Sequence, residues 1–143
     1  KVTGHYVNSI LATNEAKARS YVEALMLDMN GFVAQAPGAN FFYEKNGVLY
    51  TPALGHILPG TTRESVFNIC QALDIPVKEK NIRPEELEDA DCAFLCGTAT
   101  EIAGIESIDA KPFKKDWFDS VGESIQEAYK CQVRERSFSY VII

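Results

Sequence analysis

The chain has 143 residues, of which 46% are hydrophobic and 24% charged, an ordinary composition for a soluble globular domain with a sizeable core. Its 20 acidic and 14 basic side chains leave a net charge of −6, which gives no reason to expect nucleic acid or an anionic membrane surface as a partner. No apolar run is long enough to span a bilayer and no signal peptide is visible, so we expect a cytoplasmic protein.

The first expected element is an amphipathic helix over residues 7–20, where Val7, Ile10 and Leu11 recur at helical spacing and Glu15 turns outward. Two hairpins follow, and each contains an Asn-Gly pair. This pair favours a type I′ turn because both of its residues tolerate a positive φ. The turns are Asn30-Gly31 and Asn46-Gly47, and the expected strands are 24–27, 32–35, 41–44 and 48–51.

The second half of the chain mixes helices with strands. Thr61 and Glu64 have the spacing of a capping box, which predicts that Thr61 is the N-cap of the next helix. The remaining expected elements are a strand over 76–82, a short helix from Pro84, strands over 92–96 and 102–108, and a helix over 121–133. The pattern indicates one domain, 1–143, with a mixed α/β or α+β fold.

The sequence gives little support for a metal site. It contains four cysteines, without metal-ligand or Cys-x-x-Cys redox spacing: Cys70, Cys92, Cys96 and Cys131. We interpret them as buried free thiols in a reducing cytoplasm. His5 and His56 are too few and too far apart in the sequence to suggest metal ligands.

The run Lys-Val-Thr-Gly-His-Tyr at residues 1–6 suggests a reactive amine. Lys1 could form a Schiff base with an aldehyde cofactor, and Tyr6 could offer its hydroxyl to the phenolic oxygen of that cofactor. An amine must lose its proton before it attacks a carbonyl, and burial or a nearby cation lowers its pKa enough to allow this. Taken alone, Lys1 is more simply interpreted as a solvated terminal lysine.

Two further segments could bind anions through the main chain. Gly60-Thr61-Thr62 stands at the expected start of a helix, where unpaired N–H groups and the positive end of the helix dipole favour a phosphate. Gly97-Thr98-Ala99 follows an expected strand, and a turn of small residues there can offer two N–H groups to a carboxylate. An ordinary capped helix and a plain turn at the end of a strand are the simpler alternatives.

Together these segments resemble the fold-type IV pyridoxal-phosphate aminotransferases, most closely the branched-chain amino acid aminotransferases. The resemblance extends from Lys1 to about Lys130 and rests on four motifs in the order of the family: 1–6, 31–40 (Gly-Phe-Val-Ala-Gln-Ala-Pro-Gly-Ala-Asn), 57–63 (Ile-Leu-Pro-Gly-Thr-Thr-Arg) and 97–101 (Gly-Thr-Ala-Thr-Glu). It implies that this chain is the barrel-like large, C-terminal domain. A smaller N-terminal domain, absent from this sequence, would supply the other wall of the active site, so we expect the fragment alone to be inactive.

The resemblance also implies a cofactor and site residues. The cofactor is pyridoxal 5′-phosphate, and Lys1 is the catalytic residue that carries it and moves the α-proton of the substrate. The cofactor-binding residues implied are Lys1, Tyr6, Gln35, Leu58, Thr61, Thr62 and Thr98. The substrate-binding residues implied are Thr98 and Ala99.

The implied reaction transfers the amino group of leucine, isoleucine or valine to 2-oxoglutarate, as in branched-chain amino acid biosynthesis. The family forms dimers or larger assemblies, so we expect a homodimer or larger homo-oligomer. The apolar segment 138–143 should pack on the domain, on the missing domain or on a second subunit. A D-amino acid aminotransferase and an aminodeoxychorismate lyase of the same fold remain alternatives, and the preferred amino acid stays open.

The sequence departs from the family where the pyridine nitrogen is bound. The family pattern is Glu-Gly-x-Gly-Glu-Asn, whereas this chain has Gln35 and Ala39 in place of the two glutamates. A carboxylate keeps the pyridine ring protonated and therefore electron-withdrawing, while a neutral glutamine only donates or accepts a hydrogen bond. A catalytically weak homologue that still binds the cofactor is therefore a further alternative.

Overall fold

A computed structural model describes residues 3–134; Lys1 and the apolar segment 138–143 lie outside the described residues. The helices are α1 (Val7–Ala18), α2 (Thr61–Ala72) and α3 (Val121–Arg134), with 3-10 turns η1 (Thr3–Tyr6), η2 (Pro84–Asp89) and η3 (Trp117–Asp119). The strands are β1 (Asn40–Lys45), β2 (Val48–Pro52), β3 (Val77–Lys80), β4 (Cys92–Gly97), β5 (Glu101–Ile105), β6 (Ser107–Ile108) and β7 (Lys111–Pro112).

Five strands form one mixed sheet in the order β3-β2-β1-β4-β5, and β6 pairs with β7 in a separate ribbon. In this sheet β2 and β3 run parallel, and β1–β2, β1–β4 and β4–β5 are antiparallel pairs. The expected mixture of strands and helices is confirmed, but the expected barrel is not. Within residues 3–134 the sheet stays open, with β3 and β5 at opposite edges, because five strands are fewer than the roughly eight that enclose a filled barrel.

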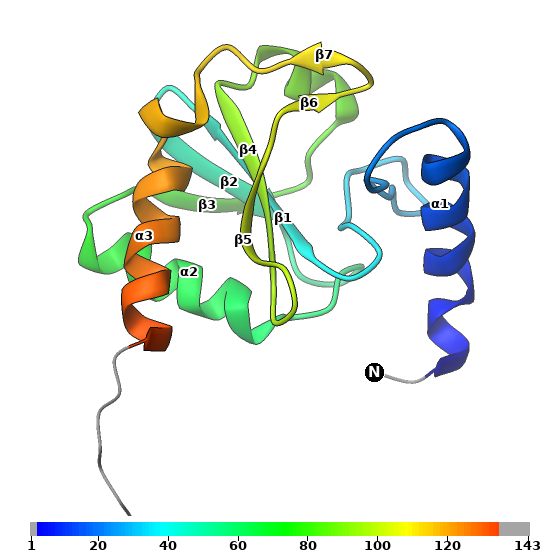
Figure 1. Cartoon of the computed structure of the whole chain (residues 1–143), viewed down its shortest axis with the longest axis horizontal. Coiled ribbons are helices and arrows are strands. Elements are labelled where there is room, and N and C mark those ends of the chain that lie inside the picture. The colour runs from blue at the N-terminus through cyan, green and yellow to red at the C-terminus, as the bar shows by residue number, and fades with distance from the viewer. Residues whose placement is uncertain (1–2, 135–143) are drawn as a thin grey trace, which may run out of the picture.

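Strand β1 is the centre of the core because both of its faces are covered (Figure 1). On one face Phe42 stacks on Phe94 of β4 with ring centroids 5.1 Å apart, and α2 and α3 cover this pair. On the other face Phe41 and Tyr43 pack under the loops and under η2. Alternation of side chains along the strand therefore fills two separate clusters.

Only one of the two expected Asn-Gly hairpins forms with the expected turn and regular strands. Asn46 and Gly47 have φ values of 53° and 72°, and they join β1 to β2 in the predicted way. At Asn30-Gly31 only the glycine has a positive φ. The segments on its two sides are joined by an isolated bridge between Leu27 and Val33 and by main-chain hydrogen bonds, without forming regular strands. The physical reason is Asp28, whose carboxylate accepts the N–H groups of Asn30 at 2.8 Å and Phe32 at 3.0 Å and so imposes a different turn.

The start of α2 also differs from the prediction. Thr61 is the first helical residue and not the N-cap; the N-cap is Gly60, in an extended conformation and without a side-chain cap. The main-chain N–H of Glu64 donates to the carbonyl of Gly60 at 3.1 Å. The first turn of α2 therefore begins directly after Gly60, and no capping box forms there.

Helix α1 stands beside the sheet and is joined to it by a long loop (Figure 1). Ala16 is the buried residue of this helix, whereas its apolar residues Val7, Ile10 and Leu11 are more than half exposed. Across residues 3–134, no helix combines the length and the apolar character that a membrane span requires.

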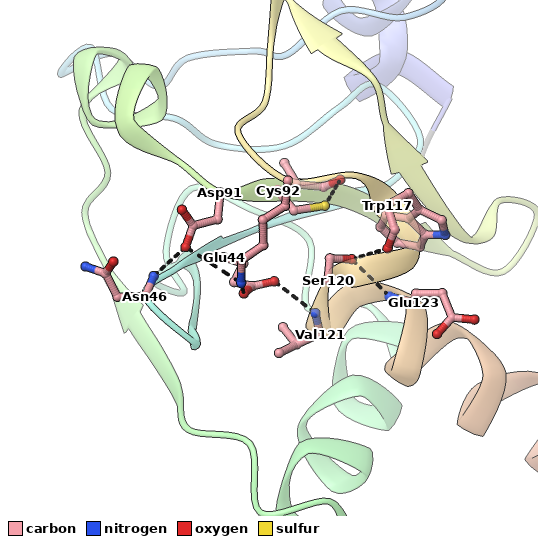
Figure 2. Close-up of polar contacts among 10 residues, drawn as sticks. Glu44, Asn46, Asp91, Cys92, Trp117, Ser120, Val121 and Glu123 are labelled. Carbon is pink, nitrogen blue, oxygen red and sulfur yellow. Dashed lines mark hydrogen bonds and ion pairs between the residues drawn. The ribbon is translucent and has the colours of Figure 1, made fainter.

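A buried carboxylate ties β1 to α3 (Figure 2). Glu44 is only 2% exposed; one oxygen accepts the N–H of Val121 at 2.9 Å, at the N-terminus of α3, and the other pairs with Lys115. Negative charge is favourable at this end of a helix. The main chain of Glu44 also accepts the N–H of Asp91 at 2.8 Å. Glu44 thus joins three segments that are distant in the sequence.

Replacing Glu44 should therefore cost more stability than replacing an exposed acid. We expect Glu44→Ala to lower the free energy of unfolding by about 3 kcal/mol, because it leaves the Val121 N–H and the Lys115 ammonium without their partner. Urea denaturation measures this, with Glu88→Ala as the control. Glu88 forms an exposed pair with Lys111, and its loss should cost less than about 1 kcal/mol. Equal losses of unfolding free energy in the two variants would contradict the stabilising role of the Glu44 contacts.

The buried cysteines should make the fold sensitive to alkali. Burial raises the pKa of the Cys70 thiol from 9.0 to about 11 and that of Cys96 to about 12. Burial also raises the pKa of Cys92. In the unfolded chain these thiols ionise with their ordinary pKa of 9.0, whereas in the folded protein they stay protonated to a higher pH. The stability that they contribute is therefore fully present below pH 9 and is lost as the pH rises towards the folded pKa.

We expect the free energy of unfolding to fall above pH 9, with each buried thiol contributing about 1.4 kcal/mol per pH unit. Cys96→Ala should make this fall less steep by about that amount, whereas Cys131→Ala should not, because Cys131 is exposed. Urea titrations at several pH values under reducing conditions provide the slopes. Identical slopes in the wild type and in Cys96→Ala would contradict the assignment.

Candidate functional site

Two of the predicted site segments meet where β1 begins and β4 ends. Asn40, the first residue of β1, pairs with Cys96 of β4. This register brings Gly97 against the preceding loop: a Cβ on Gly97 would lie 3.1 Å from the Gly38 carbonyl oxygen and 3.6 Å from the Ala39 Cβ. The 35–40 and 97–99 motifs therefore lie side by side, and a side chain at residue 97 would push them apart.

The third segment arrives at the same point. Gly60, the N-cap of α2, packs so closely on Asn40 that a Cβ there would fall well inside van der Waals contact with Asn40 Oδ1. Gly60 has no positive φ, so this close approach, and not the backbone conformation, is the local reason for glycine. The start of α2 thus lies against the start of β1.

Two side chains hold the main chain of Leu58 from opposite ends of the residue. The Leu58 N–H donates to Gln35 Oε1 at 2.8 Å, and the Leu58 carbonyl accepts from Asn40 Nδ2 at 2.8 Å. Asn40 is 5% exposed, whereas Leu58 itself is exposed. We call these two bonds the Leu58 clamp; it fixes the segment that leads into α2.

The N-terminus of α2 has the properties of an anion site. The helix has 12 residues, and the N–H groups of its first turn have no partner within the helix. Thr61 is exposed and Thr62 is buried, so the Thr61 hydroxyl faces outward while Thr62 packs inward. No acidic residue occurs in 57–62, so no carboxylate in this segment repels an anion.

Arg63 anchors the first turn of α2 to the edge of the sheet. Its buried guanidinium donates to the Pro52 carbonyl at 3.2 Å, pairs with Glu79 of β3, and lies 4.9 Å from the centroid of the Phe67 ring. Nε of Arg63 is buried without a partner among residues 3–134. The guanidinium of Arg63 therefore contacts the edge of the sheet and stabilises the position of α2.

The residues proposed for the substrate lie in the turn between β4 and β5. Thr98 and Ala99 are both exposed there, and Glu101 has a positive φ of 54° where β5 begins. Tyr6 is half-buried at the end of η1 and lines a shallow hollow of about 220 Å³ together with Pro37, two residues after Gln35. The hollow thus connects the start of α1 to the 35–40 motif.

The structure thus brings together most of the residues that the sequence suggested. Gln35 and Leu58 are hydrogen-bonded, Thr61 and Thr62 follow the Gly60 contact, and Thr98 and Ala99 follow the Gly97 contact. Lys1 lies outside the described residues, so its position relative to this cluster is not part of the structure.

The motif interpretation gave no role to Asn40 or Arg63, although both stand inside the quoted motifs. For Asn40, the signal that could have drawn attention to it is a polar residue directly before the expected apolar strand 41–44. For Arg63, it is a cation in the first turn of a helix, where a positive charge is unfavourable. In the described part of the chain, no group of three or more histidine, cysteine or acidic side chains could hold a metal ion.

Comparison with known proteins shows the family of the chain. The sequence model of the family "Amino-transferase class IV" matches residues 1–108. A probable branched-chain-amino-acid aminotransferase of Rickettsia conorii is 37% identical over 137 residues, which is 94% of this chain and 47% of that protein.

Solved structures give the same result. The branched-chain aminotransferase of Thermoproteus uzoniensis, solved with norvaline, is 46% identical with a TM-score of 0.88, over 93% of this chain and 44% of that one. The T.th. branched-chain amino acid aminotransferase, complexed with N-(5′-phosphopyridoxyl)-L-glutamate, is 38% identical with a TM-score of 0.89, over 93% of this chain and 45% of that one.

The chain therefore spans less than half of the length of these relatives. Over that length the chain shares its fold with these solved structures, as the TM-scores of 0.88 and 0.89 show. The chain belongs to the class IV aminotransferases, in the family of the branched-chain amino acid aminotransferases.

Proposed function

We propose that this chain is the cofactor-binding part of a pyridoxal-phosphate-dependent aminotransferase that transfers the amino group of leucine, isoleucine or valine to 2-oxoglutarate. The observation that carries the proposal is the junction of the 35–40, 57–62 and 97–99 segments around Asn40. Each segment contains part of one of the motifs that resemble the family, and the segments meet in close contacts at Gly60 and Gly97.

The residues present fit the phosphate of the cofactor. The absence of a Cβ at Gly60 lets the start of α2 pack against Asn40. The N–H groups at this helix N-terminus favour a dianion. Thr61 and Thr98 would add exposed hydroxyl donors from two sides, and Thr62 would contribute its main-chain N–H. The segments 57–62 and 97–100 bring no carboxylate that would oppose this charge.

When bound, pyridoxal phosphate supplies an aldehyde for the substrate amine and an electron-withdrawing ring. We propose that Lys1 holds the cofactor and then serves as a general base and acid, removing the proton from the α-carbon of the substrate and returning it to the cofactor carbon next to the ring. Tyr6 would donate its hydroxyl to the phenolic oxygen, and Gln35 would face the ring nitrogen.

The turn of Thr98 and Ala99 would bind the carboxylate of the substrate. Both residues are exposed in the β4–β5 turn, and adjacent main-chain N–H groups can hold a carboxylate without a charged side chain. Norvaline in the Thermoproteus enzyme and the glutamate adduct in the T.th. enzyme support an aliphatic amino acid and an acidic one as the pair of substrates.

We further propose that residues outside this chain complete the site and that the whole protein works as a homodimer or larger homo-oligomer. The chain covers 44–47% of the two relatives from Rickettsia conorii and Thermoproteus uzoniensis, which leaves room for another domain. Three exposed apolar residues of α1, Val7, Ile10 and Leu11, and the apolar segment 138–143 are consistent with further packing partners.

A catalytically weak homologue that binds the cofactor is the second candidate. The observation that favours it is the pair Gln35 and Ala39, which leaves residues 32–43 without any charged side chain. Such a protein would bind pyridoxal phosphate and yet convert it slowly.

One experiment separates these candidates. The full-length protein is incubated with pyridoxal phosphate and reduced with borohydride, and peptide mass mapping should find the pyridoxyl group on Lys1, with Lys17 and Lys45 unmodified. Adding leucine before the reduction should remove the label from Lys1 and shift the cofactor absorbance, because the amino group then leaves the amino acid.

A label on Lys17 or Lys45 in place of Lys1 would contradict the cofactor assignment. A label on Lys1 without any spectral change on adding leucine, isoleucine or valine would favour the weak homologue. Lys17→Arg is the matched control, because Lys17 is exposed near the end of α1 and its replacement should leave the labelling of Lys1 unchanged.

A further inference from the structure

The Leu58 clamp fixes which way the Gln35 amide points. A main-chain N–H can only donate, so the Gln35 atom that faces Leu58 N at 2.8 Å must be the carbonyl oxygen. The amide is planar, and its NH2 group therefore points away from Leu58. Turning the amide over would place two donors against each other, so the main chain of Leu58 sets this orientation.

The same reasoning applies to Asn40. A main-chain carbonyl only accepts, so the Asn40 NH2 group faces the Leu58 oxygen at 2.8 Å and Asn40 Oδ1 faces Gly60. The two amides thus bind the main chain of Leu58 in fixed orientations, Gln35 as an acceptor and Asn40 as a donor. Gln35 is half-buried, which limits the freedom of its side chain to leave the clamp for water.

We propose that Gln35 acts as a hydrogen-bond donor to the ring nitrogen of the cofactor, and that the protein thereby holds this nitrogen unprotonated. The proposal rests on the proposed function and adds a state of the cofactor to it. An NH2 donor needs a lone pair opposite it, and a pyridine nitrogen has an available lone pair only without its proton. Gln35 is thus a positioning and tuning residue, set by Leu58.

Within the described residues, the three segments of the junction offer no charge that would restore the proton. The segments 32–43, 57–62 and 97–100 contain no acidic or basic side chain. The titratable residues next to these segments are Tyr6 beside Pro37, His56, Arg63 and Asp28, which lies on the segment hydrogen-bonded to 32–35. The Asp28 carboxylate accepts the N–H groups of Asn30 and Phe32 and faces His56 at 4.0 Å, and Arg63 is engaged by Glu79 and the Pro52 carbonyl. Among the described residues, no hydrogen bond or ion pair joins a carboxylate to the Gln35 side chain.

Gln35→Glu is a matched variant for this idea. A glutamate has the same length and can still accept the Leu58 N–H with one oxygen, so the clamp is kept. Its second oxygen replaces the NH2 donor with a charged acceptor, which favours a protonated ring nitrogen. The variant therefore changes one atom's role and leaves the path of the main chain as it is.

The test uses the full-length protein loaded with pyridoxal phosphate that carries 15N in the ring. Absorbance first shows that the cofactor is bound, and 15N NMR then reports the protonation of the ring nitrogen without any turnover. We expect the wild-type nitrogen to be unprotonated at neutral pH and the nitrogen of Gln35→Glu to be protonated. The half-reaction with leucine should be faster in Gln35→Glu by about tenfold or more. A tenfold change corresponds to about 1.4 kcal/mol of additional transition-state stabilisation.

A protonated nitrogen in the wild type, with the cofactor bound, would overturn this inference and leave the proposed function intact. Failure of the wild type to bind pyridoxal phosphate would overturn both. The wild-type spectrum decides the question by itself, so the outcome does not depend on whether Gln35→Glu folds.

Discussion

The arrangement of the candidate site depends on the Leu58 clamp, the two hydrogen bonds that Gln35 and Asn40 form with the main chain of Leu58. These two hydrogen bonds, each 2.8 Å long, draw the 57–60 segment onto the start of β1 and leave Gly60 packed on Asn40. Helix α2 begins directly after Gly60, so the direction of its N-terminus follows from the clamp. Neutral hydrogen bonds of this kind contribute about 1 kcal/mol each, and their main effect here is geometric.

The sheet gives the clamp a rigid base. Strand β1 lies between β2 and β4, and its pairing of Asn40 with Cys96 sets Gly97 beside the loop before β1. Buried Glu44 at the other end of β1 ties the same strand to α3 (Figure 2). One central strand thus carries a structural carboxylate at one end and the candidate cofactor site at the other, as in many sites built on rigid elements.

Local sequence signals predicted much of the fold, but the contacts that shape the site are long-range. Asn46-Gly47 was predicted correctly because the turn needs only its own two residues, whereas Asn30-Gly31 was overridden by the Asp28 carboxylate. The motif resemblance selected the segments of the site. It did not reveal the clamp, because Gln35 and Leu58 are 23 residues apart and nothing in either segment alone indicates their pairing.

The most direct test of this account measures the affinity of the full-length protein for pyridoxal phosphate in Gly60→Ala and Gly38→Ala. A Cβ at Gly60 would displace Asn40 from Leu58 and disturb the α2 N-terminus, whereas a Cβ at the exposed Gly38 meets no atom within 4 Å. We predict that Gly60→Ala weakens binding by about tenfold or more, equivalent to about 1.4 kcal/mol, and that Gly38→Ala binds like the wild type. Wild-type affinity in Gly60→Ala would contradict the proposal that the cofactor phosphate is held at this helix N-terminus.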